Sequence, residues 1–462
     1  MDRAQVTKRW CFLAFAAGLA AAAVALVLWG PAGPTRADEP PGGAYGGIDD
    51  YYIARGWTEP LVSQPLPTET PARPAAAASY ACNLQLPAIS GGPEPMRETR
   101  ALWVTRWDFL TPTDIQRIVD KAAYAHFNTL FFQVRGQADA VYRSDLEPWW
   151  ATDKRSLGQD PGFDPLAEVI SRAHAAGLEV HAWINVYPAW RTTTPPPDSV
   201  QPLPMYHDFN ARYGNSWLQW STSGPMQLNA SYLCASPAYP AVVDHIVAVC
   251  RDILTRYPVD GLHFDYIRYD DRIYSYDPYS EQTYAAARAA DPLLTRAEWQ
   301  RRQVTGFIER VRREALPARP GARLTAAVWP VYVDRWDWFH GYDGYSARYQ
   351  DSQPWARNGL LSAIAPMLYG PSFTNYRDRF EILAHDFVAG SQPGAAILGI
   401  TGEYDSFDEI AWRIETARTA GAQGQAILSY GALAREEWAG HNYWQAFRDG
   451  PYSQIAVPNW GE

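Results

Sequence analysis

The sequence has few cysteines, no excess of positive charge, and no long apolar run after Trp29. Its four cysteines, in 462 residues, fit no zinc-binding spacing. The formal charge of −10 argues against a nucleic-acid partner, which requires a basic face. The 20 tryptophans and 28 tyrosines are abundant instead. Most of them are expected in the core, but tryptophans near loops suit stacking on the apolar faces of sugar rings.

The N-terminus has the pattern of an export signal. Lys8 and Arg9 precede an apolar run from Trp10 to about Trp29, and small residues lead to Ala37. At about 20 residues the run is also long enough to span a bilayer. We therefore predict that residues 1–37 are a signal peptide or a retained signal anchor. The protein is then exported, and is secreted or anchored in the cell envelope.

The next segment, residues 38–96, is rich in Pro, Gly and Ala and is predicted to be a linker. One cysteine lies in the signal and three remain, so at least one is unpaired in an exported protein. Cys250 occupies an apolar position of a helical pattern and is predicted to be a buried thiol. A Cys82–Cys234 disulfide is an open alternative for the other two.

From residue 97 apolar runs alternate with helical patterns, as in a parallel α/β protein. Eight strands are predicted at Thr99–Trp107, Phe127–Arg135, Leu178–Val186, Val259–Asp265, Arg323–Pro330, Leu361–Tyr369, Ala395–Thr401 and Gly424–Tyr430. Helices are predicted at Thr113–His126, Asp164–Ala176, Tyr239–Tyr257, Arg296–Ala315, Asp378–Phe387 and Phe407–Ala420. Eight such units predict a (β/α)8 TIM barrel over residues 97–450, with a C-terminal tail at 451–462. A doubly wound open sheet is the alternative, but it usually has a Gly-rich loop after its first strand, which this sequence lacks.

Polar residues follow the predicted strands at the points where the chemistry of α/β barrels is located. Asp265 ends the apolar run Val259–Asp265 and is followed by Tyr266 and Arg268. It is either a functional carboxylate or a loop residue that pairs with Arg268. Other polar or aromatic residues near strand ends are Arg106, Asp108, Arg135, Asp139, Asn185, Tyr187, Trp329, Asp334, Asp337, Tyr369, Glu403, Asp405 and Tyr430.

Several long segments, including RALWVTRWD, FNTLFFQVRGQADAVYRSDLEPW and VDGLHFDYIRY, resemble the glycoside-hydrolase-like family often called GHL10, the DUF187 or UPF0748 group. The resemblance runs from about Glu98 to Gly431. It implies a TIM barrel, export, and glycosidase action on bacterial cell-wall or other polysaccharide glycans. Matching positions carry over the family pattern at Arg135, Asp139, His181, Asn185, His263 and Asp265. Tyr266 departs from it, because many members have a second acid there, and so does Met367, where many have Gln.

Glycoside hydrolysis requires two carboxyl groups, one on each side of the scissile bond. Asp265 is predicted to be the nucleophile or charge stabiliser, and Glu403 the acid. Asp334, Asp337 and Asp139 are rivals for the acid, and Glu403 has the alternative of a loop salt bridge with an arginine. The predicted substrate contacts are Trp103, Arg135, Asp139, His181, Asn185, Tyr187, His263, Arg268, Trp329 and Tyr369.

The predicted partner is a polysaccharide or peptidoglycan glycan, with no nucleic acid, no cofactor and no metal. Membrane attachment through the N-terminal segment is left open. Two other functions also remain. The barrel could bind a glycan without cutting it, or it could be a metal-dependent hydrolase in which His181, His263 and Asp265 hold a divalent ion.

Overall fold

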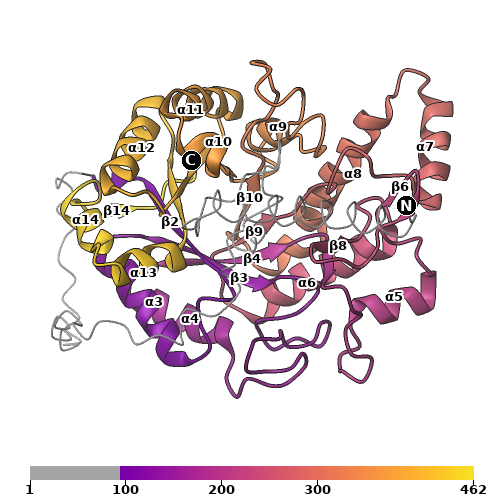
Figure 1. Ribbon diagram of the computed structural model, residues 1–462, viewed down its shortest axis with the longest axis horizontal. Coiled ribbons are helices and arrows are strands. Elements are labelled where there is room, and N and C mark those ends of the chain that lie inside the picture. The colour runs from indigo at the N-terminus through magenta and orange to yellow at the C-terminus, as the bar shows by residue number, and fades with distance from the viewer. Residues whose placement is uncertain (1–93, 462) are drawn as a thin grey trace, which may run out of the picture. The chain divides into compact units, whose positions relative to one another are not determined.

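The computed structural model describes residues 94–461, so the predicted signal, most of the predicted linker and Cys82 lie outside the described residues. Eight parallel strands form a closed barrel (Figure 1). In chain order they are β2 (Thr99–Val104), β3 (Thr129–Arg135), β4 (Glu179–Asn185), β9 (Gly261–Asp265), β10 (Arg323–Val328), β11 (Ala363–Pro366), β12 (Ala395–Thr401) and β13 (Gly424–Leu428). The predicted TIM barrel is confirmed.

Barrel closure is made by the last strand, β13, which pairs with the first, β2, so that Ala426 lies beside Ala101. The strands read as continuous apolar runs because both of their faces are covered, one by the barrel interior and one by helices. Every residue of β2, β3, β12 and β13 is accordingly buried.

The outer helices begin at recognisable caps. Thr111 and Asp114 form a capping box at the start of one helix, and the Asp164 and Ser429 side chains cap two others. The helices are α3 (Pro112–Tyr124), α4 (Pro165–Ala175), α6 (Pro240–Arg256), α8 (Arg296–Arg310), α9 (Ser352–Arg357), α10 (Pro371–Thr374), α11 (Arg377–Ser391), α12 (Phe407–Ala420), α13 (Tyr430–Trp438) and α14 (Tyr443–Asp449). The helix predicted at Arg296–Ala315 ends as a π-helical turn, Val311–Ala315. Cys250 on α6 is fully buried, as predicted.

Long insertions follow β4 and β9. After β4 come β5 (Pro188–Arg191), α5 (Met205–Tyr213), β6 (Trp220–Ser221), β7 (Gly224–Pro225) and β8 (Tyr232–Cys234). After β9 comes α7 (Pro278–Ala290). Figure 1 places α5, α7, β6 and β8 together at the right-hand side of the barrel. Among residues 94–461, no helix has the length and apolarity to cross a membrane.

The last residues pack beneath the barrel, at the N-terminal ends of the strands. The short strand β14 (Ala456–Val457) pairs in parallel with β1 (Met96–Arg97). Thr99 exchanges hydrogen bonds with the backbone of Asn459, at 2.8 and 2.9 Å. The predicted tail at 451–462 is therefore part of the barrel body through Gly461, and the body begins slightly before residue 97.

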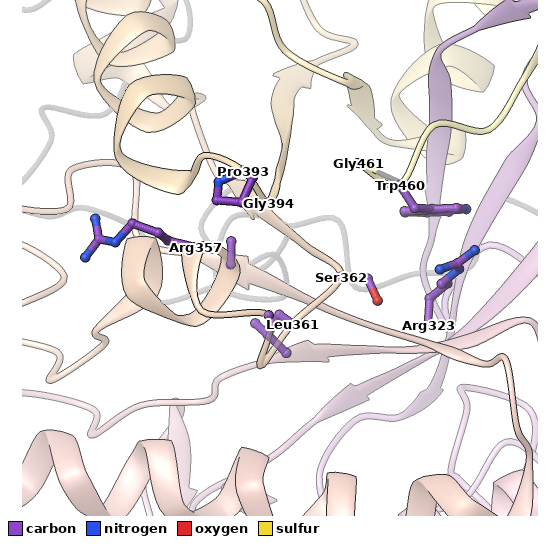
Figure 2. A pocket seen from close by; sticks show the side chains of 10 residues that line it. Arg323, Arg357, Leu361, Ser362, Pro393, Gly394, Trp460 and Gly461 are labelled. Atoms are coloured by element: carbon purple, nitrogen blue, oxygen red, sulfur yellow. The ribbon is translucent and has the colours of Figure 1, made fainter.

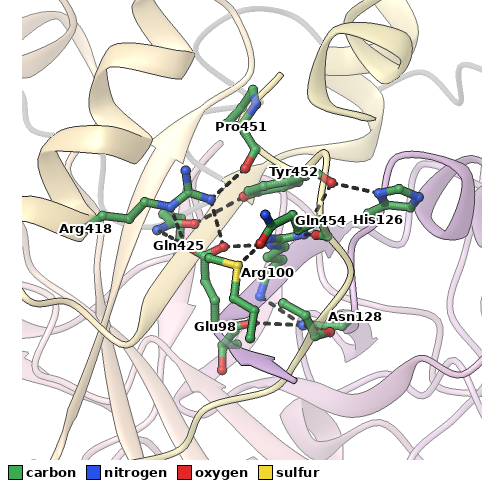
Figure 3. A network of polar contacts seen from close by, with 12 residues as sticks. Glu98, Arg100, His126, Asn128, Arg418, Gln425, Pro451, Tyr452 and Gln454 are labelled. Atoms are coloured by element: carbon green, nitrogen blue, oxygen red, sulfur yellow. Dashed lines mark hydrogen bonds and ion pairs between the residues drawn. The ribbon is translucent and has the colours of Figure 1, made fainter. Parts of the chain in front are cut away.

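A polar network at this end surrounds Glu98 (Figure 3). Its carboxylate accepts hydrogen bonds from Arg100 at 2.7 Å, from Arg418 at 2.8 and 3.0 Å, and from Gln425 at 3.1 Å. The Arg100 guanidinium also donates to the Gln454 carbonyl at 2.6 Å. These bonds satisfy charges that would otherwise be buried without partners, and they tie the first strand to the end of the chain.

Candidate functional site

Asp265 is the last residue of β9 and is completely buried at the C-terminal end of the barrel. Its Oδ1 accepts hydrogen bonds from the Tyr266 backbone N–H at 2.7 Å and from Arg268 Nη1 at 3.3 Å. Asn185 ends the neighbouring strand β4 and lies beside Asp265 in register. Two polar side chains are thus brought together at the barrel mouth, where the catalytic residues of TIM barrels are found.

Arg268 connects Asp265 to the aromatic residues around it. Its guanidinium lies 4.2 Å from the Tyr266 ring centroid and 5.7 Å from that of Trp329, which follows β10. Within residues 94–461 its Nε and Nη2 have no hydrogen-bond partner, although the side chain is only 2% exposed. Buried donors of this kind usually find a partner. Asp265, Arg268 and Trp329 are therefore brought together as predicted, with two nitrogens of Arg268 unbonded within residues 94–461.

Tyr266 has a left-handed backbone, with φ of 50°. Such a φ is rare for a bulky residue and costs about 1–3 kcal/mol, and strain of this kind is concentrated at functional sites. The turn brings the Tyr266 N–H onto Asp265 and places the tyrosine ring edge-on to Tyr232, with 5.2 Å between ring centroids. Tyr266 therefore forms a bent end of the strand β9.

A chain of contacts then leads from β9 to the loop after β2. The Tyr232 hydroxyl accepts a hydrogen bond from Arg106 Nη2 at 3.1 Å. The Arg106 guanidinium passes directly over Gly136, where an added Cβ would lie 0.9 Å from Nη1. A side chain at position 136 would therefore force the Arg106 guanidinium to move. The sequence located Arg106 at a strand end but gave no sign of this role.

Asp108 lies in the same loop as Arg106 and is 3% exposed. Its Oδ2 accepts hydrogen bonds from the Thr105 N–H at 2.7 Å and from the Thr105 hydroxyl at 3.0 Å. Its Oδ1 has no partner among residues 94–461. Burial raises the pKa of Asp108 to about 6, against the lowering effect of the Thr105 hydrogen bonds and of the Arg435 charge.

The acids predicted beside Asp265 are held differently. Glu403, after β12, is paired with Arg435 on α13 at 2.8 Å. Asp334 accepts hydrogen bonds from the backbone N–H groups of Trp338 and Phe339, at 3.0 and 2.7 Å. Glu403 therefore makes the salt bridge that was its alternative reading, and Asp334 stabilises a loop.

Asp337 is highly exposed and lies 3.2 Å from His340 on the surface of the same loop. Asp139 is buried and accepts hydrogen bonds from the N–H groups of Gly136 and Gln137, at 3.2 and 3.0 Å. This is an Asx-type turn after β3. Neither arrangement resembles that of a proton donor in a closed site.

Arg135 was predicted to contact substrate, but its donors are directed into the protein. It makes hydrogen bonds of 3.0 and 2.9 Å from Nε to the Glu147 carboxylate. Its Nη1 donates to the carbonyls of Asn185, Val186 and Pro188. Burial alone would raise the pKa of Glu147, but Arg135 and His245 lower it to about 2. Arg135 therefore supports the site from beneath, because its guanidinium is fully occupied.

Trp103 and His263 lie in the barrel interior. His263 stacks on Phe131 with 3.9 Å between ring centroids, and its Nε2 lies 3.0 Å from Trp103 Nε1. Burial, followed by the nearby His181, lowers the pKa of His263 well below its ordinary value. The ring is therefore neutral. Because Nε2 accepts from Trp103, Nδ1 carries the proton and donates to the Thr325 hydroxyl at 2.9 Å.

His181 and Tyr187 also face away from the mouth. His181 lies near the start of β4 and stacks on Trp460 of the C-terminal segment, with 4.8 Å between centroids. Tyr187 packs against Phe307 of α8, at 6.0 Å, in the layer between barrel and helices. Both placements argue against the predicted substrate contacts. Tyr369, after β11, does lie at the mouth end, edge-on to Trp103 at 6.1 Å.

In the described part of the chain, no group of three or more His, Cys, Asp or Glu side chains is arranged to hold a metal ion. A hollow of about 240 Å³ lies at the opposite end of the barrel from Asp265 (Figure 2). Its lining includes Arg323, the first residue of β10, and Trp460. Because it opens beside the starts of strands, it is separate from the site around Asp265.

Known proteins match both this sequence and this fold. Residues 98–398 match the family described as Glycosyl hydrolase-like 10. The chain belongs to this family. The resemblance noted from the sequence is therefore confirmed, and a glycoside hydrolase-like function is supported.

Among curated relatives, glycosyl hydrolase DigH of Escherichia coli K12 is 30% identical over 292 residues, which are 58% of this chain and 61% of DigH. Glycosyl hydrolase YngK of Bacillus subtilis is 25% identical over 59% of this chain and 54% of YngK. The match thus spans less than two thirds of either relative. The catalytic domain of a β-amylase from Paenibacillus polymyxa has a TM-score of 0.51 at 10% identity, covering 73% of this chain and 94% of that domain, and supports the barrel fold.

Proposed function

We propose that this member of the Glycosyl hydrolase-like 10 family is an exported glycoside hydrolase that cuts a polymeric glycan by a two-carboxylate mechanism. The observation that carries the proposal is Asp265, a buried carboxylate at the mouth end of β9 that bonds to Arg268. A carboxylate held in this way suits a nucleophile or the stabiliser of an oxocarbenium-like transition state. A cell-wall or other envelope polysaccharide is the substrate class we favour, and the signal-like N-terminus supports export.

The surroundings of Asp265 suit a sugar. The Trp329 ring supplies an apolar face, and the two Arg268 nitrogens that lack a partner in the described part of the chain supply hydrogen bonds. Together they suit a pyranose ring and its hydroxyls. Donors that are fixed before the substrate binds act without reorganisation during the reaction.

The test is to incubate the purified protein with peptidoglycan strands and with envelope and plant polysaccharides, and to measure new reducing ends. Wild-type protein is expected to release them from at least one polymer. Asp265→Asn is expected to lose at least about 1,000-fold in rate while keeping the wild-type circular dichroism spectrum, because the isosteric amide removes the charge that acts on the anomeric carbon. Binding of a glycan without cleavage by wild-type protein would instead favour a carbohydrate-binding barrel. Unchanged turnover in the variant would remove Asp265 from the mechanism.

A further inference from the structure

Within residues 94–461, the fold uses one of the two oxygens of Asp108. Oδ2 closes the turn after β2 through the backbone and the side chain of Thr105. Oδ1 is buried without a hydrogen-bond partner among the described residues. An asparagine would close the same turn through its amide oxygen without a buried acid. The turn alone therefore does not explain a carboxyl group here, because burying an ionisable group without a partner is unfavourable.

We propose that Asp108 is the second carboxyl of the reaction and that it delivers a proton from Oδ1 to the leaving glycosidic oxygen. This inference rests on the proposed glycosidase function. The barrel order β2–β3–β4–β9 places the loop of Asp108 three strands from Asp265 in a ring of eight, across the mouth. The contacts from Arg106 through Tyr232 and Tyr266 to Arg268 join the two loops at the same end of the barrel.

The charged and titratable groups facing Asp108 allow it to hold a proton. Arg435 on α13 acts on it from one side, but Glu403 pairs with that guanidinium at 2.8 Å and offsets its charge. Tyr430 also faces Asp108, and its own pKa is raised by burial and by that carboxyl. Burial therefore prevails, and the pKa of Asp108 rises to about 6. Asp265, by contrast, is paired with Arg268. An acid without a cationic partner of its own among the described residues and a carboxylate paired with an arginine differ in their surroundings, as an acid and its partner require.

The proposed step is balanced by one water molecule. As the bond between the anomeric carbon and the glycosidic oxygen breaks, that oxygen takes the proton of Asp108 and leaves as an alcohol. Asp265 supports the anomeric carbon, either as the attacking oxygen or as the base that activates water. If Asp265 attacks, a covalent glycosyl–enzyme forms, and water then displaces Asp265 and returns one proton to Asp108. If Asp265 is the base, it takes the water proton, and exchange with solvent removes that proton from Asp265 and returns one to Asp108. In both cases the water oxygen ends on the anomeric carbon.

The experiment compares wild type, Asp108→Asn and Asp114→Asn on two probes. One is the polymer that wild-type protein cuts. The other is the 2,4-dinitrophenyl glycoside of the same sugar, whose leaving group needs no protonation. Asp108→Asn is expected to lose about 100- to 10,000-fold on the polymer but less than about tenfold on the aryl glycoside. The alkaline limb of the wild-type pH profile, expected near pH 6 to 7 on the polymer, should disappear in Asp108→Asn.

Asp114→Asn is the matched control. Asp114 is also buried and lies a few residues further along the same connection, but both its oxygens have partners, in Thr111 and Arg117. It should behave as wild type on both probes. Equal losses of Asp108→Asn on polymer and aryl glycoside, or no loss, would overturn the role of Asp108 and leave that of Asp265 intact. Inactivity of wild-type protein on every polymer and aryl glycoside would instead refute the proposed function, and this inference with it.

Discussion

Two buried carboxyl groups stand near opposite ends of the same strand, β2, and they have opposite environments. Glu98, just before the strand, receives hydrogen bonds from two arginines and a glutamine (Figure 3). Asp108, just after it, bonds only to Thr105 and has one oxygen unpartnered in the described structure. Burial by itself would raise the pKa of Glu98, but Arg418 and Arg100 lower it, whereas burial prevails at Asp108 and raises its pKa to about 6.

The difference between Glu98 and Asp108 suggests that one end of the barrel serves stability and the other serves reactivity. At the start of β2, the buried charges of Glu98 and Arg100 are matched by neighbours, as in a region that holds the fold together. At the ends of β2 and β9, Asp108 Oδ1 and two nitrogens of Arg268 are buried without a hydrogen-bond partner among the described residues, as expected of a functional rather than a structural region. The Arg135–Glu147 pair refines this contrast, because it lies at the strand ends yet is fully satisfied. This pair therefore stabilises the structure around the barrel mouth and does not contribute groups to its lining.

The largest effect on stability is expected from Glu98→Ala. It would leave the fully buried Arg100 without a counter-charge, which costs about 3–5 kcal/mol of unfolding free energy. Urea unfolding at pH 7 measures this. The pKa of Glu98 is lowered in the folded state, so its contribution is present above the unfolded value of 4.5 and is lost as the pH falls through the lowered value. The control is Glu415→Ala, an exposed partner of the same Arg418, with an expected cost under about 1 kcal/mol. Equal costs for the two variants would contradict the contrast.

Asp108→Asn is expected to have a smaller effect on the free energy of unfolding, and in the opposite direction. The folded pKa of about 6 lies above the ordinary 3.8, so the contribution of Asp108 to stability is full below pH 3.8 and is lost as the pH rises through about 6. Asparagine does not titrate. The free energy of unfolding of the variant should therefore rise relative to that of wild type as the pH rises, by up to about 3 kcal/mol at pH 8. Thermal unfolding between pH 4 and 8 measures this difference, and a gap independent of pH would argue against a neutral Asp108.

The smallest effect is expected for the chemical reactivity of Cys250, which is fully buried on α6. Burial raises the pKa of its thiol to about 12, so almost no thiolate is present at pH 8. Folded protein should show no alkylation of Cys250 by iodoacetamide, as measured by mass spectrometry of its peptide. Protein unfolded in urea is the positive control. Labelling in the folded state would mean that α6 opens on the timescale of the reaction.

The barrel could be predicted because its strands are short apolar runs separated by helical patterns. The predicted and observed bounds coincide at Ala395–Thr401 and Phe407–Ala420. The helices α13 and α14 and the short strand β14 were missed, because short elements with mixed patterns give little periodicity. The role of residues 451–461 becomes clear from the structure, where they pack against the N-terminal ends of the barrel strands.

The site was harder to predict. Strands buried on both faces do not alternate between polar and apolar residues, so the sequence cannot tell an inward side chain from an outward one. Tyr187 and Trp103 illustrate this, since one packs against α8 and the other fills the barrel. Position along the strand was informative, since Asp265 ends β9 while His181 lies near the start of β4. Asp108 was located at a strand end, but its unpartnered oxygen depends on neighbours distant in the chain.

The pairing of β1 with β14 also has a consequence for how the barrel can be re-engineered. Met96 lies beside Ala456, so the first and last strands of the segment 94–461 are neighbours on the face opposite Asp265. Proteins whose terminal segments lie close together tolerate circular permutation. A linker could join the two terminal segments, and new ends could be opened in the exposed turn around Leu293, after α7. The ring of strands would then be preserved while the order in which they are synthesised changes.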